Sequence, residues 1–209
     1  MTPLPHSGSG RPRASSRRML AEAAGELFLE KGYARTTIDD IAHRAGVSRA
    51  TFFNYVGTKS DLLWVEVDEG LGRFPELLDA ADPESPVMDA VRDAVLAFVA
   101  GFGPDRLPLA VTQYELVGAE AELESSALPR FLALVRLLSA AIAKRTGENA
   151  ESLLPRAIAT AVVGAAAAAA AVWARAGVGR GPLEAVVREA VDPVCRGYAP
   201  VLHPRAESR

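Results

Sequence analysis

The sequence has little of the chemistry on which most enzymes, metalloproteins and secreted domains depend. Its 209 residues include a single cysteine, Cys195, so no disulfide can form within one chain. The three histidines, His6, His43 and His203, are far apart, and no Cys/His cluster has the spacing of metal ligands. We therefore expect no metal and no cofactor, and the lone thiol suits the reducing cytoplasm.

Candidate catalytic groups are equally scarce. His6 and His203 lie in the tails, and no acidic partner stands at a fixed short spacing from any histidine. Asp39 and Asp40 form a carboxylate pair, but acidic residues in the first turn of a helix are favoured by the helix dipole alone. We predict no catalytic residue.

A secretory signal and a membrane span are also not expected. The first eighteen residues, MTPLPHSGSGRPRASSRR, contain arginines but no apolar core with a cleavage site, and we interpret residues 1–14 as a flexible basic arm. Residues 157–174 run without a charge for the length of a membrane span. This run is mostly alanine and is flanked by Arg156 and Arg175, which favours a buried helix and no membrane partner.

Charge is distributed unevenly along the chain. Residues 1–64 contain nine Lys/Arg and six Asp/Glu, whereas residues 65–209 contain fourteen and twenty, within a net charge of −3. The N-terminal part is thus the end at which a polyanion would bind.

The apolar spacing is helical throughout, without a competing strand pattern, so we predict an all-α fold. Ser15 or Ser16 is expected to cap a first helix that ends at Lys31, and a fourth helix, capped by Thr58, is expected to break or kink at Pro75. Five longer helices are predicted at Val87–Phe102, Leu107–Ala119, Pro129–Thr146, Ser152–Arg175 and Pro182–Tyr198.

Two short helices between these are joined at one glycine. Thr37 can cap the first of them with Asp40 in a capping box, and Ser48 can cap the second. Gly46 stands where the chain must turn sharply. This arrangement is a helix-turn-helix, whose second helix enters the major groove of DNA.

Residues 18–61 resemble the DNA-binding domain of the TetR family of bacterial transcription regulators. The resemblance lies in AAGELFLEKGY, then TTIDDIAHRAGVSRAT, then an aromatic run that ends in TKSDLL. It implies an N-terminal three-helix DNA-binding domain, followed by a larger helical effector-binding and dimerisation domain. The expected divisions are an arm at 1–14, the DNA-binding domain at 15–63, the second domain at 64–200 and a flexible tail at 201–209.

The resemblance also implies which residues contact double-stranded operator DNA. Two positions depart from the family pattern: phenylalanine replaces the usual tyrosine at 53, and asparagine replaces the common histidine at 54. Asn54 could pair with adenine or only cap a neighbouring carbonyl group. The expected phosphate contacts are Thr37, Tyr55 and Lys59, the residues that face bases are Arg49, Ala50, Phe53 and Asn54, and Ser48 and Thr51 complete the set.

The second domain is expected to bind a small, largely apolar effector and to form a homodimer. For each aromatic residue taken singly, core packing is the competing role. The candidate pocket residues are Phe74, Phe98, Phe102, Gln113, Tyr114 and Phe131. The resemblance places the helices near 152–175 and 182–198 in the dimer interface, and small residues would let these helices approach closely.

These features together predict a ligand-responsive regulator, most simply a repressor that binds an inverted-repeat operator as a dimer. Two alternatives stay open. One is an all-helical enzyme or scaffold with a vestigial helix-turn-helix, and the other is a constitutive DNA binder without an effector.

Overall fold

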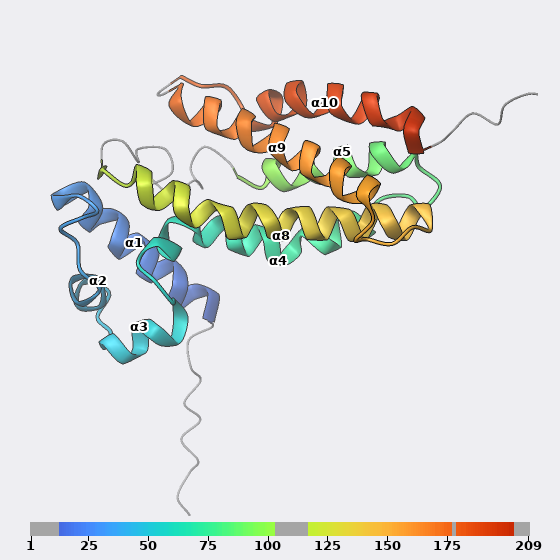
Figure 1. Cartoon of the computed structure of the whole chain (residues 1–209). Coiled ribbons are helices and arrows are strands. Elements are labelled where there is room, and N and C mark those ends of the chain that lie inside the picture. Colours follow the sequence, from blue (N-terminus) through green and yellow to red (C-terminus); the bar gives the residue numbers. More distant parts are fainter. Residues whose placement is uncertain (1–12, 103–116, 177–178, 203–209) are drawn as a thin grey trace, which may run out of the picture.

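The chain is entirely helical over the residues that the computed structural model describes, which are 13–102, 117–176 and 179–202. Figure 1 shows a small group of short helices at one end of a long bundle. The elements in order are α1 Arg13–Lys31, α2 Ile38–Arg44, α3 Arg49–Tyr55, the 3₁₀ helix η1 Ser60–Trp64, α4 Val65–Asp79, α5 Val87–Ala100, α8 Glu120–Thr146, α9 Leu153–Arg175 and α10 Leu183–Leu202. An all-α fold is thereby confirmed.

Helices α1, α2 and α3 and the 3₁₀ helix η1 enclose an apolar cluster, which we call the N-terminal core. Leu20 and Phe28 of α1, Ile41 of α2, Phe52 of α3 and Leu63 of η1 are all at most 2% exposed within it. Burying a side chain of this size contributes about 1.5–3 kcal/mol, so five of them fix how the short helices pack.

Helices α4, α5, α8, α9 and α10 form a second cluster, the bundle core. α9 packs against both α8 and α10, and α5 packs against α10. Ile142 of α8, Ile158 and Val162 of α9, and Val187 of α10 are fully buried in it.

Two predicted helix starts were wrong, and α4 does not break at Pro75. α1 begins at Arg13, so Ser15 and Ser16 lie inside it rather than capping it. α4 continues through Pro75 to Asp79, and α8 begins at Glu120 and contains Pro129. A proline inside a helix removes one backbone hydrogen bond, but packing outweighs this loss where neighbouring residues are buried, as Phe74 is.

One predicted helix lies mostly outside the described residues, and another ends at a different residue than predicted. The expected helix Leu107–Ala119 lies almost wholly outside the described residues, and so do Gln113 and Tyr114. α10 extends to Leu202, four residues beyond the predicted end at Tyr198 and two residues into the tail expected at 201–209.

The start of α8 belongs to the N-terminal core, although it follows the bundle helix α5 in sequence. Val117, Ala119 and Leu123 pack into this core, and the backbone N–H of Tyr33 donates to the carbonyl oxygen of Val117 at 2.8 Å. α8 therefore joins the two parts of the molecule along its own length, as Figure 1 shows.

Helices α8 and α9 are long and apolar enough to cross a membrane by length and composition alone. Core helices of soluble proteins pass the same test. In this fold both helices pack against each other and against further bundle helices.

Candidate nucleic-acid interface

The turn between α2 and α3 has the geometry that a helix-turn-helix needs. Gly46 has φ of +68°, a left-handed conformation that is unfavourable for residues with a Cβ. The backbone N–H of Val47 donates to the carbonyl oxygen of Ala42 at 2.9 Å, which closes the turn. The predicted role of Gly46 is confirmed.

Helix α2 begins at a complete capping box. The hydroxyl of Thr37 accepts from the backbone N–H of Asp40, and the Asp40 carboxylate accepts from the backbone N–H of Thr37 at 2.9 Å. The Lys31 ammonium donates to the same carboxylate at 2.6 Å and, with Thr37, holds the pKa of Asp40 well below its usual range. Thr37 itself is exposed.

Helix α3 has one face in the core and one face in solvent. Ser48 caps it by accepting from the backbone N–H of Thr51 at 3.0 Å, while Phe52 is fully buried. Arg49, Ala50 and Asn54 are exposed, and Phe53 is 47% exposed, which is unusual for so large an apolar ring. Thr51 and Tyr55 are half-buried at the edges of this face.

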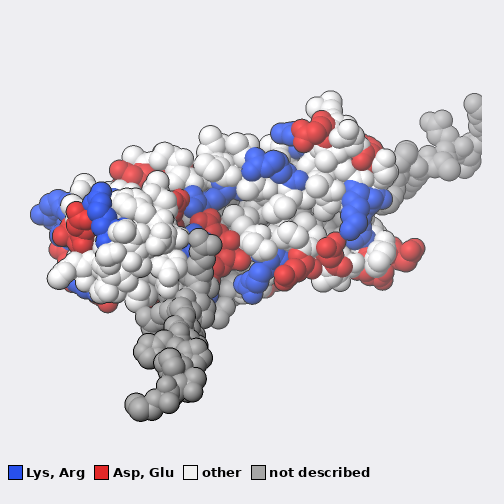
Figure 2. Space-filling view, turned by 90° about the horizontal axis from the view of Figure 1, so that it is seen from below, with Lys and Arg blue, Asp and Glu red and all other residues white. Residues whose placement is uncertain are grey.

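Figure 2 looks at the molecule from the side of α2 and α3. Uncharged side chains fill much of this end, and basic and acidic side chains lie mixed at its rim. Specific DNA readout uses hydrogen bonds and apolar contacts to base edges, so an uncharged centre with cations at the rim suits that role.

Arg49 does not extend freely from α3. Its Nη1 donates to Asp39 of α2 at 2.7 Å, and its guanidinium carbon lies 5.5 Å from the centroid of the Phe53 ring. Both side chains of the ion pair are more than half exposed, so the pair contributes at most about 1 kcal/mol. A guanine edge or a phosphate can therefore displace Asp39 at little cost.

Lys59 ties η1 to the turn that follows α1. Its Nζ donates to the carbonyl oxygens of Tyr33 at 2.7 Å and of Thr36 at 2.8 Å, and lies 3.9 Å from the Tyr33 ring centroid. Burial lowers the pKa of Lys59 and raises the pKa of Tyr33 to about 12. An ammonium group has three N–H donors, and these two carbonyl oxygens accept from two of them.

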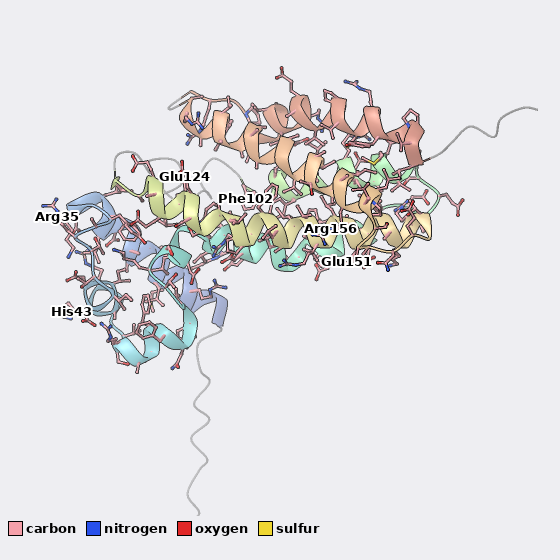
Figure 3. The ribbon with its side chains drawn as sticks, in the orientation of Figure 1. Arg35, His43, Phe102, Glu124, Glu151 and Arg156 are labelled. Atoms are coloured by element: carbon pink, nitrogen blue, oxygen red, sulfur yellow. The ribbon has the colours of Figure 1, made fainter. Side chains whose placement is uncertain are left out.

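Other basic residues at this end differ in their availability. Arg44 is held by Glu26 at 2.9 Å and by Glu30 at 2.7 Å, with its pKa raised by these partners. Arg35 and His43 are exposed at the outer edge of the small domain, as Figure 3 shows. Arg35 stands two residues before the Thr37 cap and was not among the expected DNA contacts.

Helices η1 and α4, which follow the helix-turn-helix, are connected to α8 by a group of polar contacts that we call the Arg130 junction. Arg130 donates from Nε and Nη2 to Asp68 of α4 at 2.7 and 2.8 Å, and from Nη2 to Asp61 of η1 at 3.2 Å. Its guanidinium lies 5.2 Å from the Trp64 ring, whose Nε1 donates to Ser126 at 2.7 Å. The local sequence did not indicate this junction, because each contact across it joins residues more than sixty positions apart.

The aromatic residues proposed for an effector pocket divide into two groups. The Phe74, Phe98 and Phe102 rings stack edge to face, with centroids 5.3 and 5.0 Å apart. Phe98 and Phe102 line a cavity of about 430 Å³ between α1, α4 and α5, whereas Phe74 is fully buried. Phe131 packs against the bundle core and does not line this cavity.

No metal site stands out in the part of the chain that the structure describes, because no three Cys, His, Asp or Glu residues gather there in a suitable group.

Comparisons with known proteins agree with this architecture. Residues 20–64 match the family model of bacterial regulatory proteins of the tetR family, and residues 85–199 match the model of the MftR C-terminal domain. The transcriptional regulator MftR of Mycobacterium tuberculosis is 28% identical over 173 residues, which are 82% of this chain and 87% of that protein.

Solved structures share the fold at low sequence identity. NalD of Pseudomonas aeruginosa, a repressor of a multidrug efflux pump, has a TM-score of 0.59 and 20% identity, covering 88% of this chain and 96% of its own. Thermus thermophilus FadR, a TetR family repressor solved with lauroyl-CoA, has a TM-score of 0.56 and 22% identity, covering 87% and 94%. The two matching models together span the helix-turn-helix and most of the bundle, and the chain belongs to the TetR family of bacterial regulatory proteins, whose members are DNA-binding transcription regulators.

Proposed function

We propose that this protein is a ligand-responsive repressor of the cytoplasm that binds an inverted-repeat operator as a homodimer and is released by a small, largely apolar effector. The observation that carries the proposal is the solvent-exposed face of α3, which has Arg49, Phe53 and Asn54 at its surface above a fully buried Phe52. An exposed aromatic ring and an exposed amide on a rigid short helix are suited to contacts in the major groove.

The contacts with DNA divide into positioning and reading. Thr37, Tyr55 and Lys59 are proposed to contact phosphates. Thr37 caps the start of α2, Tyr55 is the last residue of α3, and Lys59 precedes η1, so all three lie at helix ends around α3. Arg49, Ala50, Phe53 and Asn54 are proposed to face base edges, with Ser48 and Thr51 at the first turn of α3.

The homodimer is proposed to form through α9 and α10. The exposed surface of α9 consists largely of alanine around Val172, which is 62% exposed, and α10 exposes Val201 at 50%. Exposed apolar surface on two neighbouring long helices favours association with a second copy of the same helices. A twofold dimer would present two copies of α3 to consecutive major grooves.

Control by an effector is proposed to act through α4 and α8 together. The Arg130 junction joins these helices to η1, and the first turns of α8 pack into the N-terminal core. A ligand that shifts either helix within the bundle would therefore shift the short helices as well, and two rigid elements transmit the change.

The deciding experiment is a fluorescence-anisotropy titration of the purified protein against the DNA that flanks its own gene. We expect sequence-selective binding to an inverted repeat, with Asn54→Ala weakening it and the exposed control Glu124→Gln on α8 leaving it unchanged. If the protein binds this DNA selectively but no compound in a metabolite screen releases it, the result would favour a constitutive DNA binder without an effector. Absence of selective binding would favour an enzyme or scaffold with a vestigial helix-turn-helix.

A further inference from the structure

The cavity between α1, α4 and α5 has walls from both parts of the molecule. Arg18 and Glu22 of α1 form one side, and α4 and the end of α5 form the others. Its volume of about 430 Å³ is that of a small-molecule pocket. Figure 3 labels Phe102, which lines the cavity just beyond the end of α5.

One wall of the cavity is aromatic. The Phe98 and Phe102 rings meet edge to face at 79°, so they present surfaces in different directions. Gly70 of α4 permits this packing, because a Cβ there would lie 2.9 Å from Cε2 of Phe98 and 3.2 Å from Cζ of Phe102. The face of an aromatic ring carries partial negative charge and attracts organic cations.

The other walls carry an excess of negative charge. Four glutamates and two arginines line the cavity, and Arg18 is already committed to Glu69, with its Nε 3.1 Å from Oε2. Glu66 forms no ion pair within the described residues, and its Oε2 is buried without a hydrogen-bond partner there. Burial raises the pKa of Glu66, and the neighbouring Glu69 and Glu22 act in the same direction, whereas a backbone hydrogen bond and the nearby Arg18 act against it.

We propose that this cavity binds a small organic cation with an apolar body, whose ammonium group pairs with Glu66 and whose body rests on Phe98 and Phe102. A cation there supplies the partner of opposite charge that Glu66 lacks. The aromatic wall also favours a cation over a neutral molecule of the same shape. The proposal names the effector class of the regulator proposed above and rests on that function only for its effect on DNA.

Binding is tested by isothermal titration calorimetry on the full chain, with three probes that differ only in the charge of one end: 4-phenylbutylammonium, 4-phenylbutan-1-ol and 4-phenylbutyrate. We expect the cation to bind about tenfold more tightly than the alcohol, as a desolvated charge interaction allows, and the anion to bind least. Glu66→Gln should remove about tenfold of the cation's affinity and leave the alcohol unaffected. Phe102→Leu should lower the affinity for the cation severalfold.

Glu124→Gln is the matched control, because Glu124 is exposed on α8 and does not line the cavity. Thermal unfolding by circular dichroism establishes that each variant is folded. Four outcomes would each overturn the proposal. They are equal affinity for the alcohol and the cation, tightest binding of the anion on Arg73, an unchanged affinity of Glu66→Gln for the cation, and binding of none of the three probes.

A separate titration of operator-bound protein distinguishes the two proposals. If 4-phenylbutylammonium binds with the expected selectivity and releases DNA, both stand. If it binds with that selectivity but DNA affinity is unchanged, the cavity assignment stands and effector control through it fails. If the protein does not bind its operator at all, the proposed function fails while the calorimetric result still decides the cavity.

Discussion

Arg130 of α8 and Asp68 of α4 form a two-point ion pair, with Nε–Oδ1 and Nη2–Oδ2 distances of 2.7 and 2.8 Å. The side chain of Arg130 is 14% exposed and that of Asp68 is 21% exposed, so solvent screens the pair only in part. Asp68 also accepts from Arg17 of α1 at 3.4 Å. One carboxylate on α4 thus joins the bundle to the DNA-binding helices.

We expect Arg130→Met to lower the free energy of unfolding by about 2 kcal/mol, less than the loss of a fully buried partner, because Asp68 keeps some contact with water. The double variant Arg130→Met/Asp68→Asn should recover part of this loss, because the carboxylate at position 68 is removed, whereas Asp61 still lacks its arginine partner. Urea denaturation measures both. In the single variant, the effect of a bound effector on operator affinity should also shrink, and full retention of that coupling would show that α4 alone transmits the signal.

Lys59 combines a structural role with the proposed phosphate contact. Lys59→Ala leaves the carbonyl oxygens of Tyr33 and Thr36 without their charged donor, and we expect a loss of about 1–3 kcal/mol in unfolding free energy. If the third N–H meets a phosphate, the slope of log affinity against log salt falls by about 0.9 as well. A destabilised but folded variant with an unchanged slope would limit Lys59 to the structural role.

Arg49 and Asp39 should have opposite effects on DNA binding. Arg49→Ala is expected to relax preference at one base pair by about 1–3 kcal/mol if the guanidinium reads guanine. Asp39→Asn removes the carboxylate that pairs with Arg49 at 2.7 Å and should strengthen operator binding, because a negative charge near phosphates is lost. Anisotropy titrations on operators with single base changes measure both, and weaker binding by Asp39→Asn would mean that Asp39 orients Arg49 for its contact.

The dimer interface can be tested by arginine substitutions on α9. Val172 is 62% exposed, and we expect Val172→Arg to shift sedimentation toward the monomer, because a charge would be buried in the interface. Ala169 is 6% exposed and belongs to the bundle core, so Ala169→Arg should destabilise the protomer itself. Leu128→Arg on α8, at a position 59% exposed, is the control that should leave the dimer intact. A wild-type monomer at micromolar concentration would refute this interface.

Cys195 should be chemically inert in the folded protein. It is 3% exposed, and burial raises the pKa of its thiol to about 11, so the reactive thiolate is scarce at pH 8. We expect iodoacetamide to modify it slowly at pH 8 without denaturant and rapidly in guanidinium chloride, as mass spectrometry can follow. Rapid modification of the native protein would indicate that α10 opens.

The sequence alone determined the helix-turn-helix, because its signals are local. The Thr37–Asp40 capping box, the Ser48 cap and the left-handed Gly46 each depend on residues within three positions of one another. Phe52 and Val56 are one helical turn apart, and both are buried, as this spacing favours. The same local reasoning misplaced the start of α8 at Pro129, and α4 does not break at Pro75, because burial against distant helices outweighs the loss of one backbone hydrogen bond.

Only the tertiary structure decided how the two parts are joined. Nothing in the local sequence indicates that Val117 packs under α1, that Arg130 meets Asp61 and Asp68, or that Lys59 bridges two carbonyl oxygens of an earlier turn. These contacts join residues that stand from twenty-three to more than eighty positions apart, and their partners are chosen by the packing of whole helices. Helical periodicity specifies which face of a helix is apolar, but the helix that covers this face is selected only when the chain closes on itself.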